Sequence, residues 1–182
     1  MSNSLLLPLY SQVKHFNGTG NFAIDKYYKF PFSFFYKKKL KMIIKYLEPN
    51  KVYHNILDFG SGKAEIFRTE LKRHAESVKC VDIGYTLDYR WKFDVIVCAS
   101  VLEFVYLPHT LRTLRGILNP KGLLLVSSPT SNILSKLYLW IIGDKSRRND
   151  ESDIIREIKC HFNIIEEHNW FGLYFSIKAV LK

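Results

Sequence analysis

Short apolar runs alternate with segments of helical periodicity along most of this chain. The apolar runs predict strands at 55–58, 78–82, 93–98, 123–127, 162–167 and 174–181, and the periodic segments predict helices at 34–48, 109–118, 133–142 and 152–160. This order indicates an α/β fold in which helices cover both faces of a mostly parallel sheet. The last two strands are separated only by a turn, so we expect them to pair antiparallel.

The first apolar run ends in an acid and then turns through two glycines into a predicted helix. Residues 55–65 have the sequence Asn-Ile-Leu-Asp-Phe-Gly-Ser-Gly-Lys-Ala-Glu. Glycines allow a tight turn and a close approach of ligand to backbone, and the first turn of a helix has unpaired N–H groups. The second run also ends in an acid, Asp82, about one strand-helix-strand unit after Gly60. This pattern predicts a turn that holds a nucleoside.

Composition is typical of one globular domain. The chain has 182 residues, of which 47% are hydrophobic. The first ten residues do not resemble a signal peptide, and Ile133–Ile142 is far shorter than the roughly 20 apolar residues of a membrane-spanning helix. Three cysteines, at 80, 98 and 160, lack the paired spacing of a metal site. Cys80 and Cys98 lie in predicted buried strands, so the pattern predicts reduced core thiols, a cytoplasmic protein and no bound metal.

The formal net charge of +10 has two interpretations. The basic side chains either solvate the surface or attract an anionic partner, which could be nucleic acid, an acidic membrane surface or an anionic substrate. Five lysines lie between residues 37 and 45, beside apolar residues at helical spacing. This segment predicts a basic amphipathic helix over 34–48 whose apolar stripe covers the sheet, with a membrane-surface helix as the alternative.

Four motifs together resemble class I S-adenosylmethionine-dependent methyltransferases. In family order they are Ile56-Leu57-Asp58-Phe59-Gly60-Ser61-Gly62, Val81-Asp82-Ile83, the segment from Phe93 to Glu103, and Leu118-Asn119-Pro120-Lys121-Gly122-Leu123-Leu124-Leu125-Val126. The resemblance runs from about Asn55 to Pro129. It implies a Rossmann-like sheet and S-adenosyl-L-methionine as the cofactor.

The resemblance also implies contacts to the methionine part of this cofactor. Gly60, Ser61 and Gly62 would lie against it, and Asp58 would reach its amino group directly or through water. These assignments place the amino-acid end of the cofactor at the first glycine turn.

Contacts to the other parts of the cofactor are implied in the same way. Asp82 would accept hydrogen bonds from both ribose hydroxyls, and Ile83 would pack on the adenine. Ala99 and Ser100 would border the methionine end near the sulfonium methyl. Asp88 has two interpretations, either the acid near the adenine amino group or an ordinary loop residue.

A dinucleotide-binding fold shares this architecture, but one residue argues against it. The sixth motif position holds Glu65, whose bulk prevents close helix packing and whose charge would repel a pyrophosphate.

The chain departs from the family pattern at three places. Ala64 replaces a third glycine, Phe104 stands where relatives often have a histidine, and only ten residues separate Asp82 from Phe93. Ten residues can reach from the end of one strand to the start of the next only if they run almost straight over the sheet. We therefore expect one edge strand and its helix to be missing or reduced, with Tyr85, Tyr89 or Trp91 as cover for the adenine.

The sequence assigns no catalytic base. The candidates are His109 and Tyr106 near the expected pocket mouth, and His15 and Tyr28 in the N-terminal arm.

Substrate choice should depend on two segments outside the shared motifs. The first is an N-terminal arm or lid at 1–33, and the second is 133–142 with Trp140. The second segment could wall an apolar acceptor site or contact a membrane surface that holds lipid-like acceptors. We expect one methyltransferase-like domain over 1–182, with the arm at 1–33, the basic helix at 34–48 and the core at 55–182.

Three functional hypotheses follow. The chain could methylate a small-molecule or lipid-like acceptor, or it could methylate nucleic acid through the lysine-rich face. It could also be a non-catalytic relative that binds the cofactor or a partner protein. The sequence does not identify the acceptor or the oligomeric state.

Overall fold

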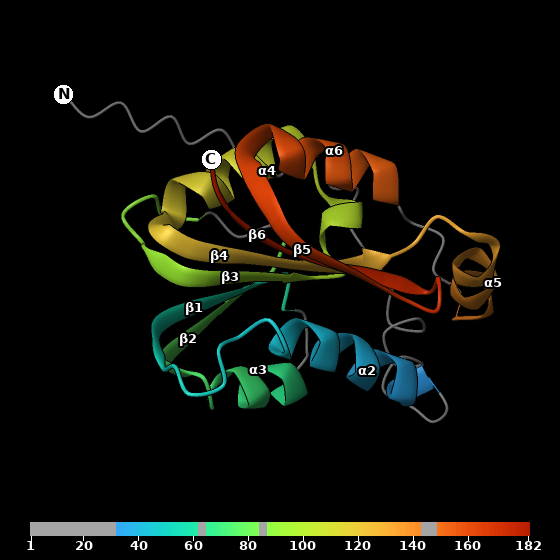
Figure 1. Cartoon of the computed structure of the whole chain (residues 1–182), viewed down its shortest axis with the longest axis horizontal. Coiled ribbons are helices and arrows are strands. Elements are labelled where there is room, and N and C mark those ends of the chain that lie inside the picture. The colour runs from blue at the N-terminus through green and yellow to red at the C-terminus, as the bar shows by residue number, and fades with distance from the viewer. Residues whose placement is uncertain (1–31, 62–64, 84–86, 143–148) are drawn as a thin grey trace.

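The computed structural model describes residues 32–61, 65–83, 87–142 and 149–182 (Figure 1). Its helices are α2 (Phe32–Ile44), α3 (Glu65–Leu71), α4 (Leu107–Ile117), α5 (Ile133–Ile142) and α6 (Glu151–His161), with a short 3₁₀ helix η2 (Leu102–Phe104). Its strands are β1 (Tyr53–Phe59), β2 (Ala75–Val81), β3 (Phe93–Ala99), β4 (Leu118–Pro129), β5 (Phe162–Trp170) and β6 (Tyr174–Leu181).

The six strands form one sheet in the order β2-β1-β3-β4-β6-β5. Strands β1 to β4 pair in parallel, whereas β6 is antiparallel to both β4 and β5. The predicted α/β fold class, including the antiparallel end, is confirmed. The strand order reverses between β1 and β3, and such a switch point is where open parallel sheets bind ligands.

Helices cover both faces of the sheet (Figure 1). On one face α4 and α6 pack over a buried cluster that includes Leu111, Ile158 and Ile96. On the other face α2 and α3 pack over a second cluster, to which α2 contributes Leu40 and Ile43. The prediction that the basic helix covers the sheet with its apolar stripe is therefore confirmed.

The predicted helix over 34–48 ends earlier than expected. Beyond Ile44, the N–H groups of Tyr46 and Leu47 donate to carbonyls three residues back, so the chain closes in tight turns. Both side chains are buried, and the Tyr46 hydroxyl contacts Ser176 of β6 at 3.0 Å. The turns thus bring Tyr46 and Leu47 onto the sheet.

The connection between β2 and β3 contains no strand within its described residues, 82–83 and 87–92. In the part of the chain that the structure describes, β2 pairs only with β1 and lies at the edge of the sheet. This agrees with the expectation that one edge strand is missing.

Strand β4 begins at Leu118, five residues before the predicted start. Asn119–Gly122 was expected to separate helix from strand, but this segment belongs to β4. The register between β3 and β4 shifts here, because Phe93 pairs with Leu118 and Val95 pairs with Leu123. A Cβ atom on Gly122 would lie 2.7 Å from the Leu118 side chain, so glycine permits the bulge.

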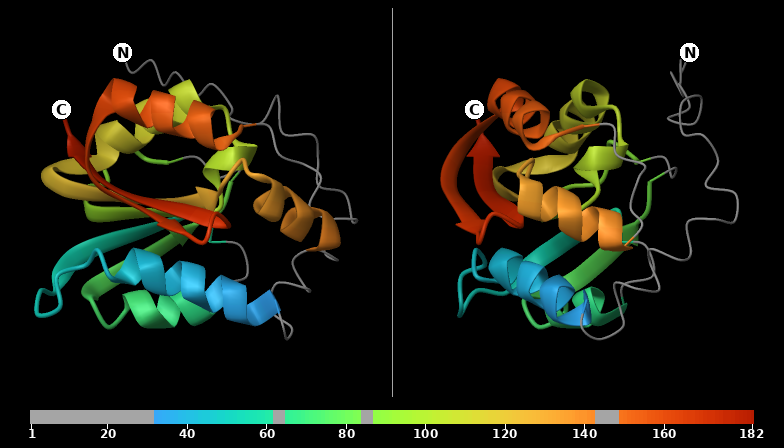
Figure 2. Two further views of the ribbon diagram at one scale, coloured as in Figure 1. Left: turned by 45° about the vertical axis from the view of Figure 1, so that its right-hand side comes forward. Right: turned by 90° about the vertical axis from the view of Figure 1, so that its right-hand side faces the viewer.

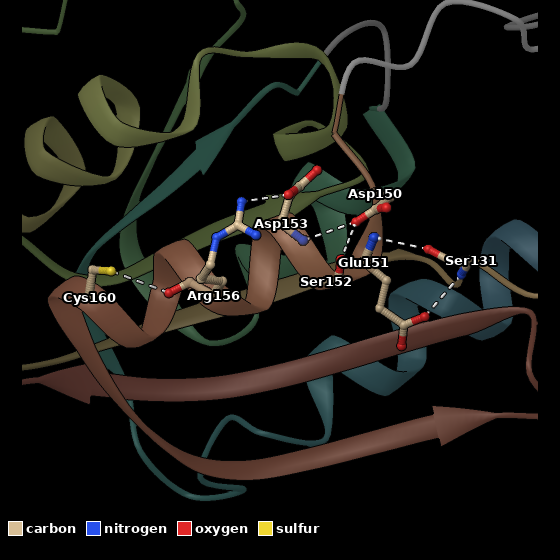
Figure 3. Close-up of polar contacts among 7 residues, drawn as sticks. All are labelled: Ser131, Asp150, Glu151, Ser152, Asp153, Arg156 and Cys160. Atoms are coloured by element: carbon tan, nitrogen blue, oxygen red, sulfur yellow. Dashed lines mark hydrogen bonds and ion pairs between the residues drawn. The ribbon is translucent and has the colours of Figure 1, made fainter.

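The start of α6 is fixed by side-chain hydrogen bonds (Figure 3). Asp150 caps the helix by accepting the N–H of Asp153 at 3.0 Å. The Glu151 carboxylate accepts the N–H of Ser131, and the Ser131 hydroxyl accepts the N–H of Glu151 (Figure 3). This reciprocal pair ties the segment between β4 and α5 to the start of α6.

The three cysteines are free thiols in different environments. Cys98 is buried, Cys80 is half-buried and Cys160 is exposed. Burial, followed by the charges of Asp58 and Glu103, raises the pKa of Cys98 well above its ordinary range. The prediction of two core thiols is met fully only by Cys98, because β2 is an edge strand. The cytoplasmic location stays a prediction.

Candidate cofactor site

The carboxyl ends of β1, β2 and β3 lie side by side at one edge of the sheet. Asp58, near the end of β1, pairs with Cys80 of β2 and Val97 of β3. Asp82 directly follows β2, and Ser100 directly follows β3. The structure therefore brings Asp58, Asp82 and Ser100, with Ala99 at the end of β3, together at the carboxyl ends of these strands.

Asp58 is a buried acid with an open oxygen. Its side chain is 1% exposed, and its Oδ2 atom has no hydrogen-bond partner within the described residues. Burial and then the negative charge of Asp82 raise the pKa of Asp58 to about 7, although the positive charge of Lys39 opposes this rise. A buried carboxylate with an unused acceptor atom is suited to bind an ammonium group.

Gly60 is required by the turn that follows β1. Its φ is +79°, and its N–H donates to the Val81 carbonyl at 2.7 Å. A Cβ atom at this position would lie 2.2 Å from Cγ2 of Val101. Val101 thus occupies the space where a side chain of residue 60 would lie. Glycine is needed at this position both for the turn and for the packing of Val101. Ser61 follows and is half-exposed, whereas the predicted contact Gly62 lies outside the described residues.

Ser100 has a left-handed backbone with φ of 55°, which is uncommon for a residue other than glycine. Its N–H donates to the Ser127 carbonyl at 2.8 Å, and its hydroxyl oxygen accepts a hydrogen bond from Nζ of Lys39, also at 2.8 Å. Both partners come from other elements, so the surrounding structure holds this conformation. Residues held in uncommon backbone conformations tend to cluster at functional sites.

Lys39 is a site residue that the sequence analysis did not identify. It was grouped with the surface lysines of the basic helix, but its side chain is only 2% exposed. Its Nζ reaches Ser100 and also lies 5.6 Å from the centre of the Tyr174 ring. The signal in the sequence is its spacing, since Phe35, Lys39 and Ile43 follow each other at intervals of four and share one helical face.

Asp82 and Ile83 lie at the end of β2. Oδ1 of Asp82 accepts the N–H of Ile83 at 2.8 Å, and the Asp82 side chain is half-exposed. Ile83 is half-buried and packs against the cluster under α4 and α6. Asp82 therefore keeps Oδ2 free of hydrogen bonds from the described residues, and its role at the ribose stays a prediction.

The connection after β2 holds the predicted adenine contacts. Asp88 forms an ion pair with Arg90 at 2.7 Å. The hydrogen bonds that the side chain and backbone of Arg90 donate to Asp88 lower the pKa of Asp88 to about 2. The hydroxyl of Tyr89 lies 3.2 Å from that of Thr113. Trp91 is half-buried beneath the Lys79 ammonium, which lies 3.0 Å from the ring centre. The role of Asp88 at the adenine stays a prediction, and Tyr85 lies outside the described residues.

The candidate bases are spread over two parts of the chain. Tyr106 precedes α4 and is 65% exposed, and His109 is half-buried in the first turn of α4. Within the described residues neither side chain makes a hydrogen bond that would orient it as a base. His15 and Tyr28 lie outside the described residues.

A second residue that the sequence analysis missed supports the segment after β3. The Asn149 side chain donates to the carbonyls of Leu102 and Val105, both at 2.7 Å, and its N–H donates to the carbonyl of Glu103. These bonds fix η2 beside the site. No sequence motif marks Asn149, because the contact spans more than forty residues.

The site therefore combines a buried ammonium, a buried carboxyl and a half-exposed carboxylate. It lacks the donor set of a metal centre, since the described residues contain no group of three His, Cys, Asp or Glu side chains that could hold a metal ion.

A family model described as a methyltransferase domain matches residues 33–170. A search of curated proteins finds no significant match. Among solved structures, magnesium protoporphyrin IX methyltransferase from Synechocystis PCC 6803 with bound SAM has a TM-score of 0.64 at 15% identity, covering 92% of this chain and 94% of that chain.

Two further solved structures have the same fold. The N-methyltransferase NodS from Bradyrhizobium japonicum WM9, in complex with S-adenosyl-L-homocysteine, has a TM-score of 0.62 at 13% identity, covering 81% of this chain and 87% of that chain. Human N-acetylserotonin methyltransferase in complex with SAM has a TM-score of 0.61 at 14% identity, covering 81% of this chain and 52% of that chain. At such identities the likeness establishes the fold.

Proposed function

The chain belongs to the class I S-adenosylmethionine-dependent methyltransferases, and we propose that it methylates a small-molecule or lipid-like acceptor. The observation that carries the proposed site is the open Oδ2 atom of Asp58, buried at the sheet edge beside Asp82 and Lys39. A buried acceptor atom without a donor calls for a ligand that brings one.

The residues at this edge fit the cofactor. Its amino-acid end carries one ammonium and one carboxylate, and the chain offers the Asp58 carboxyl to the first and the Lys39 ammonium to the second. The Asp82 carboxylate is available for the ribose hydroxyls. When bound, S-adenosylmethionine supplies an electrophilic methyl group on its sulfonium sulfur.

The chain's own contribution to the reaction is to align the acceptor and to exclude water. Ala99 and Ser100 lie at the carboxyl end of β3, and the Lys39 hydrogen bond helps to hold Ser100 in its left-handed conformation. A base is needed only for an acceptor that loses a proton as it attacks. His109 and Tyr106 stay the described candidates for that role.

The acceptor class rests on two supporting observations. The similar solved structures include an N-methyltransferase and enzymes named for magnesium protoporphyrin IX and N-acetylserotonin, which are small molecules. In this chain α5 follows the carboxyl end of β4 and exposes large apolar side chains, among them Leu137 and Trp140. An apolar surface next to the site favours an apolar acceptor.

Calorimetric titration with S-adenosylmethionine and S-adenosyl-L-homocysteine tests the cofactor site directly. We expect both to bind, and the Asp82→Ala variant to bind each more weakly. A correctly folded protein that binds neither would be a non-catalytic relative, and the proposal would be wrong.

A transfer assay then tests the acceptor class. Radiolabelled S-adenosylmethionine is incubated with the protein and either a lipid and small-molecule extract or purified RNA and DNA. We expect label in the extract. Label only in nucleic acid, together with binding that weakens steeply with salt, would instead support the nucleic-acid alternative.

A further inference from the structure

Helix α5 has an apolar side that faces away from the protein. Its inward side chains Ser135, Tyr138 and Leu139 are buried. Its outward side chains are exposed by 52% to 82% of their surface, and they are Ile133, Leu134, Leu137 and Trp140. A helix of a globular protein normally turns one apolar stripe to the core and polar residues to water. Helix α5 is apolar on both sides.

The exposed side of α5 continues onto two neighbouring elements. The Phe35 ring of α2 lies 5.4 Å from that of Tyr138 on α5 and 5.9 Å from that of Trp170 at the end of β5. These contacts bring the start of α2, helix α5 and the β5–β6 turn to one end of the molecule (Figure 2). Phe34 and Phe171 are exposed at this end by 51% and 79%. We name the exposed side chains of α5, Phe34 and Phe171 the α5 face.

The charge around the α5 face has one sign. Helix α2, helix α5 and the β5–β6 turn from Asn169 to Tyr174 contain no Asp or Glu. Exposed lysines lie on both helices, namely Lys37, Lys38, Lys41 and Lys136. The nearest acids along the chain lie outside these elements. They are Asp25 before α2, Glu48 after it, Asp144 after α5, and Glu166 and Glu167 farther along β5. The face is therefore apolar with a positive rim.

We propose that the α5 face docks on the surface of an anionic lipid bilayer. Apolar and aromatic side chains enter the boundary between headgroups and acyl chains, while the lysines contact acidic headgroups. None of the described helices is long and apolar enough to cross a membrane.

Charge argues against a second copy of this chain as the occupant of the α5 face. A two-fold contact would bring the same rim of lysines together from both molecules, with no acids on these elements to pair with them. Nucleic acid would use the lysines but would leave Leu137 and Trp140 exposed to water. An anionic bilayer would bury the apolar side chains and also pair with the lysines.

Docking in this orientation also places the candidate site at the lipid. Strand β4 ends at Pro129 and α5 begins at Ile133, so the face adjoins the sheet edge that holds Ser100 and Asp58. An acceptor dissolved in the bilayer would meet the candidate site without leaving the lipid.

Vesicle co-sedimentation of the full chain tests this proposal. The probe is vesicles of equimolar phosphatidylglycerol and phosphatidylcholine, compared with pure phosphatidylcholine. We expect binding to the anionic vesicles, and at least about tenfold weaker binding for the double variant Leu137→Ser, Trp140→Ser. Lys37→Gln and Lys136→Gln should each weaken binding about fivefold.

Two variants on other surfaces are the matched controls. Ile165→Ser changes a side chain of β5 that is 54% exposed, and Lys159→Gln changes an exposed lysine of α6. Both should bind vesicles like the parent protein. Circular dichroism and S-adenosyl-L-homocysteine binding check that each variant is folded, and vesicle binding does not require that the protein transfer a methyl group.

Three outcomes would overturn the proposal. The first is no sedimentation with anionic vesicles. The second is binding that depends on the lysines but not on Leu137 and Trp140, which would mean unspecific attraction. The third is a dimer in sedimentation velocity that the double variant abolishes, without vesicle binding by the parent, which would assign the face to a second copy.

Discussion

Nζ of Lys39 on α2 lies 2.8 Å from the hydroxyl oxygen of Ser100 at the end of β3. This bond joins α2, which precedes the first strand, to Ser100, which directly follows β3 at the switch point of the sheet. The Lys39 charge also acts on the carboxyl of Asp58 in β1. A cation from outside the family motifs thus connects two of the residues that those motifs predict.

Replacing Lys39 should weaken cofactor binding. Lys39→Met keeps most of the buried chain but removes the ammonium that we assign to the cofactor carboxylate. We expect S-adenosyl-L-homocysteine affinity to fall by about 1.5–3 kcal/mol, the usual worth of a charged hydrogen bond, as measured by calorimetry.

The neighbouring Lys38 provides the control for Lys39. It is exposed and lies 5.6 Å from the centre of the Phe34 ring, so Lys38→Met should leave affinity unchanged. Equal losses in both variants would mean that Lys39 acts only through the general charge of α2.

The Asp82→Ala variant tests the ribose assignment. Loss of the carboxylate should reduce affinity for S-adenosylmethionine by about 1–3 kcal/mol, because two charged hydrogen bonds disappear. Glu76→Ala, which removes an exposed acid from the strand that precedes Asp82, is the control for charge alone. An Asp82→Ala protein that binds as tightly as the parent would exclude Asp82 from the ribose.

The raised pKa of Asp58 predicts a pH dependence of stability. Its ordinary value is 3.8 and its value in the folded protein is about 7, so between these values the folded state binds more protons than the unfolded state. Stability from this group therefore falls as pH rises through that window. Asp58→Asn should increase the free energy of unfolding by about 2–4 kcal/mol at pH 8 relative to the parent, and have little effect near pH 4.

The ionisation of Asp58 should also control the affinity for the cofactor. The ionised form of Asp58 attracts an ammonium group, so S-adenosyl-L-homocysteine affinity should rise about tenfold between pH 6 and pH 8 in the parent. In Asp58→Asn this rise should vanish, although the variant is folded. A pH-independent affinity in the parent protein would contradict the assignment of Asp58 to the amino group.

Gly60→Ala should destabilise the protein for two separable reasons. The left-handed backbone costs an alanine about 1 kcal/mol, and the new Cβ collides with Val101, so the total should exceed about 2 kcal/mol in chemical denaturation. In a Val101→Gly background the collision is absent, and Gly60→Ala should cost only the backbone part. Equal costs in both backgrounds would mean that Val101 does not fill this space.

The fold was predictable because local patterns determine most of it. The runs at 93–98 and 174–181 agree closely with the boundaries of β3 and β6, and the short connection after Asp82 indicated the missing strand. The start of β4 was not predictable from local signals. Helix α4 does end just before Asn119-Pro120, but Leu118 already pairs with Phe93, and the strand continues through a bulge that depends on tertiary contacts.

The candidate site was predictable where it follows a motif. Asp58, Gly60, Asp82 and Ser100 all lie at ends of strands, and parallel pairing brings such ends together without further information. The contribution of Lys39 depends on how α2 packs across the sheet, which no local pattern records. Its burial could be inferred only from its position on the apolar stripe.

The absence of a described strand beyond β2 has a consequence for how the protein behaves in concentrated solution. The outer backbone of β2 offers hydrogen-bonding groups to any extended chain, and such a strand is a starting point for aggregation. Glu76 and Lys79 are exposed along it, and their charges disfavour the stacking of identical strands. The charges of these two side chains therefore help to protect the outer edge of the shortened sheet from aggregation.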